Sequence, residues 1–160
     1  MHFNATLPQF RTAITITSSP KPFRVHFTHV KSPHAHAMPF LLLPTFPLTN
    51  LSLIPLLKPL TEPDDPQDHQ PYHVIAPSIP GLGFSDAPSD QSTSLLEDTA
   101  QIFNLLMLKL GYEYYIASST GSGVTSPASV DYHILRILAS KYSENSLGIH
   151  IIDPPCNHQL

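Results

Sequence analysis

Charged side chains are scarce in this sequence. Asp, Glu, Lys and Arg make up 12% of its 160 residues, about half of the ~25% that is usual in globular domains. With so little charge and so many Leu, Ile, Val and Phe residues, the composition excludes a disordered charged tail. Lys and Arg total 8, the formal net charge is −4, and the basic residues form no cluster. A nucleic-acid-binding module is therefore not expected.

Disulfides and membrane segments are excluded on similar grounds. The one cysteine, Cys156, has no partner within the chain, which excludes a disulfide scaffold and favours a reducing compartment. Residues 1–10 lack the basic start and the apolar run of a secretory signal. The most apolar stretch, residues 38–60, contains five prolines and therefore does not suit a spanning helix. We expect a soluble, cytoplasmic protein.

The ten histidines are scattered and do not predict a metal site. His34 and His36 are two residues apart, but no carboxylate or cysteine lies close to them in the sequence. Such a pair is more typical of an exposed polar loop than of a metal centre. We expect neither a metal nor a cofactor.

Hydrophobic patterns predict strands that alternate with helices. Residues 11–17 and 23–30 alternate apolar and polar side chains, and the proline-containing connector between them predicts a hairpin. In the second run, Val25 and Phe27 fall on the side opposite to Arg24, His26 and Thr28. The further predicted strands are residues 39–43, 72–76, 112–117 and 147–152, and the predicted helices are residues 51–60, 94–110 and 130–142.

The clearest of these elements is the helix over residues 94–110. Its apolar side chains recur every three or four residues and form one face. Ser94 and Glu97 have the spacing of a capping box at its start. Gly111 follows at the position where a left-handed residue commonly ends a helix.

This order of elements indicates an α/β fold, with a mostly parallel sheet flanked by helices. In such sheets ligands bind at the carboxyl ends of the strands. The loops to consider are therefore residues 44–50, 77–85 and 118–123. The last of these, SSTGSG, is predicted to be a tight turn of small residues.

The stretch VIAPSIPGLGFSDAP, residues 74–88, is the most specific motif in the chain. It resembles, almost residue for residue, the loop after the fourth strand in epoxide hydrolases that carry an N-terminal extension, which have the α/β-hydrolase fold. Similar resemblances cover residues 7–16, 25–43 and 96–117. The resemblance implies that residues 1–22 end the N-terminal extension. It implies that residues 23–160 form a partial α/β-hydrolase core whose lid and C-terminal half are absent.

The chemistry that the resemblance implies depends on an aspartate at a sharp strand-to-helix elbow, which attacks an epoxide carbon. In this chain the elbow falls on residues 119–123, with Ser119 and Gly123 as its small flanking residues. The nucleophile position is then Gly121, which has no side chain. Ser119 and Ser122 are weaker alternatives. Ser119 would shift the elbow by two residues, and Ser122 has β-branched residues at the flanking positions.

The family's oxyanion loop also differs in this chain. Its His-Gly-aromatic-Pro pattern falls on residues 44–47, where only the aromatic Phe46 and the proline Pro47 match. Backbone N–H groups at Phe46 and Ser122 could still face a developing oxyanion. Because no nucleophile accompanies them, we interpret Phe46 and Pro47 as packing residues.

The remaining catalytic groups of the family have no counterpart in this sequence. The resemblance places the lid tyrosines, the late acid and the catalytic histidine beyond Leu160. His133 and His150 lie in other segments, a predicted helix and a predicted strand, and are not expected to replace that histidine.

Three hypotheses follow. The first is an epoxide hydrolase-like chain without hydrolase activity. The second is a fragment of a longer active hydrolase that acts on small-molecule epoxides or esters. The third is a non-catalytic interaction module that self-associates through the exposed edge of its last strand.

Overall fold

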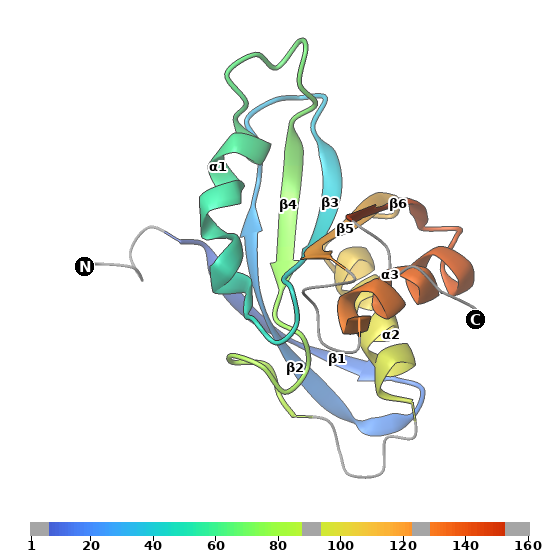
Figure 1. The fold of residues 1–160 in the computed structure, drawn as a ribbon. Coiled ribbons are helices and arrows are strands. Elements are labelled where there is room, and N and C mark those ends of the chain that lie inside the picture. The colour runs from blue at the N-terminus through green and yellow to red at the C-terminus, as the bar shows by residue number, and fades with distance from the viewer. Residues whose placement is uncertain (1–6, 88–93, 123–128, 153–160) are drawn as a thin grey trace, which may run out of the picture.

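The computed structural model describes residues 7–87, 94–122 and 129–152 (Figure 1). The strands in this part of the chain form one sheet in the order β1-β2-β4-β3-β5-β6. Their bounds are β1 (Gln9–Ile16), β2 (Ser19–Val30), β3 (Met38–Leu43), β4 (Tyr72–Pro77), β5 (Tyr115–Ser122) and β6 (Ser146–Ile152). The predicted α/β class is confirmed, and each predicted strand has a counterpart within a few residues.

The sheet combines an antiparallel edge with a parallel remainder. Strand β1 pairs antiparallel with β2, as the predicted hairpin requires, and β2 pairs antiparallel with β4. Strand β3 pairs parallel with both β4 and β5, and β5 pairs parallel with β6. The carboxyl ends of β3, β4 and β5 therefore meet at one end of the sheet.

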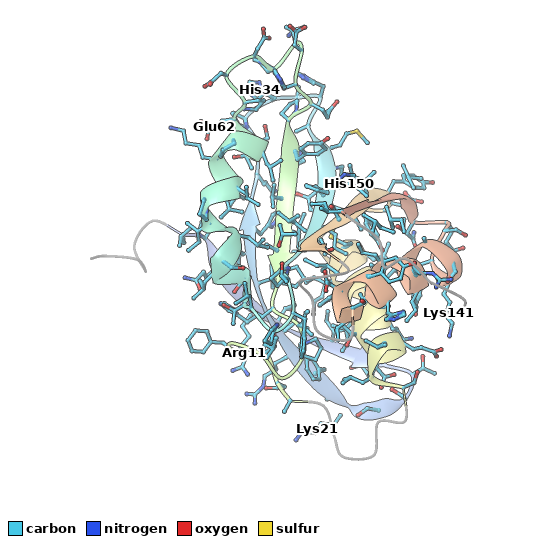
Figure 2. The ribbon with its side chains drawn as sticks, in the orientation of Figure 1. Arg11, Lys21, His34, Glu62, Lys141 and His150 are labelled. Atoms are coloured by element: carbon cyan, nitrogen blue, oxygen red, sulfur yellow. The ribbon has the colours of Figure 1, made fainter. Side chains whose placement is uncertain are left out.

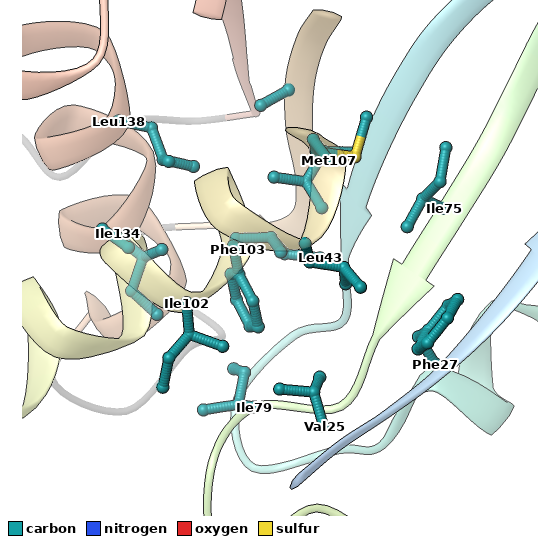
Figure 3. Packing of buried hydrophobic residues seen from close by; sticks show 14 of the residues in the cluster. Val25, Phe27, Leu43, Ile75, Ile79, Ile102, Phe103, Met107, Ile134 and Leu138 are labelled. Carbon is teal, nitrogen blue, oxygen red and sulfur yellow. The ribbon is translucent and has the colours of Figure 1, made fainter. Parts of the chain in front are cut away.

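Helices cover both faces of the sheet, which explains why its central strands are almost wholly apolar. Helix α1 (Ile54–Thr61), preceded by the 3₁₀ turn η1 (Asn50–Leu53), lies on one face (Figure 1). Helices α2 (Leu95–Lys109) and α3 (Val130–Lys141) lie on the other. The larger core fills the space between the sheet and these two helices (Figure 3), where Leu43, Phe103 and Ile134 are fully buried.

Helix α2 agrees with its predicted pattern except at its start. Phe103 and Leu106 are buried, and Gly111 adopts the predicted left-handed conformation with φ +88°. The capping box is wrong in one half, because the Ser94 hydroxyl makes no capping hydrogen bond to the backbone. Glu97 forms a side-chain hydrogen bond with Ser94 and also an ion pair of 2.8 Å with Lys141. Lys141 lies at the end of α3 (Figure 2).

Strand β2 departs from its predicted pattern because both of its faces are covered. His26 and Thr28, which were expected on a polar face, are buried together with Val25 and Phe27. The ring of Phe84, in the loop after β4, packs edge-on against His26 at 5.2 Å between ring centroids. The alternation of apolar and polar side chains in β2 could not reveal that its second face is buried, because the residues that bury it are far away in the sequence.

Strand β5 continues through Ser122, so the tight turn predicted over residues 118–123 is wrong for the described residues. Ser119 aligns with Leu43 of β3, and Ser122 aligns with Ile152 of β6. The register of β5 with β6 shifts between Ser118 and Ser122. Gly123 lies outside the described residues.

Membrane-spanning helices and metal-binding clusters are both absent from the described residues. No helix there is both long enough and apolar enough to cross a membrane. No group of three or more His, Cys, Asp or Glu side chains there could hold a metal ion.

Candidate functional site

The loops that follow β3 and β4 contact each other and the end of β5. The Thr45 N–H donates a hydrogen bond of 3.2 Å to Oγ1 of Thr120 on β5. Gly83, in the loop after β4, has φ +58° and lies so close to Thr49 and Ser78 that a Cβ there would sit 3.3 and 3.0 Å from their side chains. A glycine suits both the left-handed backbone and the close approach.

A buried polar network joins these two loops to β2. Asn50 Nδ2 donates to Oγ1 of Thr28 at 2.9 Å, and the Ser78 hydroxyl donates to Oδ1 of Asn50 at 2.9 Å. All three side chains are buried. Because buried polar groups are costly when unpaired, this network fixes the start of η1 against the end of β4.

Ionic contacts attach the loop after β4 to the hairpin. Asp86 accepts hydrogen bonds from the Arg11 side chain at 2.7 Å and from the Arg24 side chain at 3.1 Å, and also from the Arg24 N–H. Arg11 lies near the end of the sheet opposite to His34 (Figure 2). Burial opposes ionisation of Asp86, but hydrogen bonds from Arg24 and the charges of Arg24 and Arg11 outweigh it and lower the pKa of the carboxyl group.

The same loop holds Ser85 and presents Phe84. The Ser85 hydroxyl accepts a hydrogen bond from the His26 N–H at 3.0 Å and donates one to the carbonyl oxygen of Ser78. Burial, together with the nearby charge of Arg11, lowers the pKa of His26. Phe84 is 65% exposed although it contacts His26, so the loop displays an aromatic ring at the carboxyl ends of the strands.

Phe46, a predicted oxyanion-hole position, lies in the loop after β3. Its side chain lies against the larger core, and the peptide bond between Phe46 and Pro47 is cis. The segment folds back immediately, since the Leu48 N–H donates to the Thr45 carbonyl oxygen at 2.7 Å.

Gly121, the predicted nucleophile position, lies directly against a carboxylate. A Cβ atom at Gly121 would collide with Oδ2 of Asp131, and Cγ and Oδ1 of Asp131 would lie 2.9 and 3.1 Å from it. Asp131 stands in the first turn of α3 and is 1% exposed. Gly121 does not have a left-handed backbone, which agrees with an extended strand rather than a strained elbow at this residue.

The other residues singled out in the sequence are not brought together around Gly121. Ser119 is 1% exposed, and its hydroxyl lies 3.4 Å from the carbonyl oxygen of Gly121 in the same strand. His150 is exposed on β6, and its Nδ1 lies 3.0 Å from the Ser118 hydroxyl. His133 is exposed on α3.

Sequence reasoning missed Asp131 and Asn50. Asp131 had one available signal, since it is an acidic residue in the first turn of the predicted helix over residues 130–142. Asn50 had none, because its partners Thr28 and Ser78 are distant in the sequence.

Comparison with known proteins agrees with this arrangement. The profile of the family described as "Epoxide hydrolase N terminus" matches residues 1–53. Epoxide hydrolase 1 of Oryctolagus cuniculus is 35% identical over 116 residues, which cover 68% of this chain and 24% of the rabbit protein.

Solved structures show the same relationship. The epoxide hydrolase of Aspergillus niger superposes with a TM-score of 0.73 and 25% identity over 95% of this chain and 36% of its own. Juvenile hormone epoxide hydrolase of Bombyx mori shares the fold, with a TM-score of 0.76 over 96% of this chain and 33% of its own. The chain thus spans about a quarter of the length of the curated relatives it matches. In sequence and in fold, the chain is similar to part of an epoxide hydrolase.

Proposed function

We propose that this chain provides the N-terminal extension (residues 1–22) and part of the α/β-hydrolase core (residues 23–160) of an epoxide hydrolase fold, and that it does not itself hydrolyse epoxides. One observation carries the proposal. The resemblance places the attacking residue at Gly121, and the space that a side chain would need there is filled by the carboxylate of Asp131.

Ser119, one of the two serines offered as substitutes, is a poor nucleophile in this setting. Ser119 is buried in the middle of a paired strand, where a substrate does not reach its hydroxyl. An attacking serine also needs a base within hydrogen-bonding distance. The hydrogen bond that Ser119 makes is to the backbone of its own strand. As part of the same proposal, Ser119 and Gly123 are the small flanking residues of the elbow, and Phe46 and Ser122 are the oxyanion-hole positions.

The ligand class follows from the relatives. The relatives are named as epoxide hydrolases, so a small-molecule epoxide or ester is the ligand we propose to test, either for this chain or for a longer protein that contains it. On cysteine usage we propose the cytoplasm as its location.

Epoxide turnover tests the proposal. The purified chain is incubated with an aryl epoxide, and diol formation is measured against the buffer alone. We expect no diol above the uncatalysed rate. Turnover that is abolished by Ser119→Ala or Ser122→Ala, with the Ser52→Ala variant still active as the matched control, would overturn the proposal.

A second function is favoured by the β6 edge. Leu147 and Ile152 are 60% and 44% exposed, and β6 has a paired neighbour on one side only among the described strands. Exposed apolar edges pair readily with other chains, so we propose self-association as the alternative. Analytical ultracentrifugation of the wild type and of a Leu147→Lys variant tests self-association. An edge-paired dimer of the wild type should dissociate in the variant. A monomeric wild type would contradict self-association.

A further inference from the structure

Two histidines and a tyrosine from separate parts of the chain meet at the opposite end of the sheet from the candidate site. His29 lies near the end of β2, His73 lies near the start of β4, and Tyr112 follows α2. His29 Nε2 is 2.9 Å from the Tyr112 hydroxyl, and the His73 ring stacks on the Tyr112 ring at 6.0 Å between centroids. All three side chains are half-buried. We call them the His29–Tyr112–His73 cluster.

One hydrogen bond defines the protonation state of His73. The Ser32 N–H donates to Nδ1 of His73 at 3.0 Å. A backbone N–H can only donate, so this bond requires an unprotonated Nδ1 and hence a neutral ring that carries its proton on Nε2. Taking up a second proton at Nδ1 turns this acceptor into a donor, and the Ser32–His73 hydrogen bond is then lost.

Ser32 connects this titratable ring to two other parts of the fold. Its hydroxyl donates to the carbonyl oxygen of Thr61, the last residue of α1, at 2.6 Å. Ser32 also begins the connection to β3, whose far end is held by a hydrogen bond from the Met38 N–H to the carbonyl oxygen of Pro71. Protonation of His73 therefore acts on the junction of residues 31–37, the end of α1 and the start of β4.

The surrounding charges oppose protonation. Among the described residues, the charge of Lys31 acts on both imidazole rings, and the charge of His73 acts on His29. Tyr112 is the titratable group in direct contact with the cluster's histidines. Burial, followed by the charge of Lys31 and that of His73, lowers the pKa of His29. Burial, followed by the charge of Lys31, lowers the pKa of His73. Burial raises the pKa of Tyr112, so its hydroxyl stays neutral.

We propose that the His29–Tyr112–His73 cluster is a pH-sensitive latch, which releases residues 31–37 from the end of α1 and the start of β4 when its imidazoles take up protons. The latch is closed at neutral pH, where both rings are neutral. Because folding disfavours the charged rings, the open form binds more protons than the closed form once the pH falls below the ordinary imidazole pKa of 6.5. The free energy of opening the latch therefore decreases as the pH falls from 6.5 towards the lowered pKa values of the folded state.

Amide hydrogen exchange at Ser32 tests the latch in the full chain. Protection factors, corrected for the intrinsic exchange rate, are measured between about pH 7.5 and about pH 5.5, a window that spans imidazole titration. In the wild type we expect the protection factor of the Ser32 amide to be constant above pH 6.5. Below that pH, the protection factor should fall by up to about tenfold per pH unit for each proton that the cluster takes up. Amides in β3 should keep their protection.

Matched variants separate the latch from general acid sensitivity. His73→Asn keeps an acceptor near the position of Nδ1 but does not titrate, so the pH dependence at Ser32 should largely disappear. His133→Gln, on the exposed side of α3, should behave as the wild type. An unchanged pH dependence in His73→Asn, or Ser32 protection that does not vary with pH in the wild type, would overturn the latch. If His73→Asn does not fold, NMR titration of the wild-type His73 ring decides: a midpoint at or above 6.5 contradicts the proposal.

Discussion

The carboxyl ends of β4 and β5 flank the same strand, β3, but they are built in different ways. The loop after β4 is held by the Asn50 network, by Ser85 and by the two arginines that bind Asp86. The end of β5 remains extended through Ser122, with a register shift against β6, and its Gly121 lies against the carboxylate of Asp131. The first region carries the motif that resembles the family's loop, while the second has a glycine at the position where the resemblance predicts the attacking group.

Placing an aspartate at position 121 should have the largest effect. Its Cβ would collide with Asp131, and a second buried carboxylate would add charge repulsion. We expect Gly121→Asp to lower the free energy of unfolding by more than about 3 kcal/mol, measured by urea denaturation, without epoxide turnover. Gly148→Asp is the control, because nothing lies within 4 Å of a Cβ there. Equal costs at both positions would refute the crowding at Gly121.

Breaking the buried network under the β4 loop should have an intermediate effect. Asn50→Ala leaves Ser78 and Thr28 without their side-chain partner, which we expect to cost about 1–3 kcal/mol. Ser52→Ala is the matched control, because its exposed hydroxyl bonds only within the adjacent turn. The same urea midpoint for both variants would mean that the network does not support the loop.

Removing the charge of Asp86 should have the smallest effect. Asp86→Asn should cost less than about 1 kcal/mol at neutral pH, because both arginine partners are largely exposed. The lowered pKa means that this contribution is present above the ordinary value of 3.8 and is lost as the pH falls through the lowered pKa. Wild-type and variant urea midpoints should therefore converge in acid. Asp64→Asn, an exposed carboxylate outside this loop, should differ little from the wild type at any pH.

Much of the fold was predictable from the sequence because its signals are local. The apolar run at residues 39–43, the three-and-four spacing that buries Phe103, and the left-handed Gly111 each follow from a few adjacent residues. The loop after β4 was predictable from its motif. The path of β5 was not, because small residues are compatible with a tight turn and also with an extended strand.

Contacts between distant segments account for the remaining errors. His26 is buried by a loop about sixty residues later, so its alternation with Phe27 was misleading. Glu97 has the spacing of a capping residue, but it also pairs with Lys141 on α3, which is distant in the sequence. At the candidate site, the glycine at position 121 could be read directly, whereas the carboxylate that fills its space depends on how α3 packs against β5.

The most direct test of this account is a double-mutant cycle between positions 121 and 131. Gly121→Ala should cost about 1–3 kcal/mol in the free energy of unfolding of the wild type, because the new methyl group meets the Asp131 carboxylate. In an Asp131→Ala background the same substitution should cost less than about 0.5 kcal/mol, as should Gly148→Ala in either background. An identical cost of Gly121→Ala in both backgrounds would contradict the account, because Asp131 would then not fill the space at Gly121.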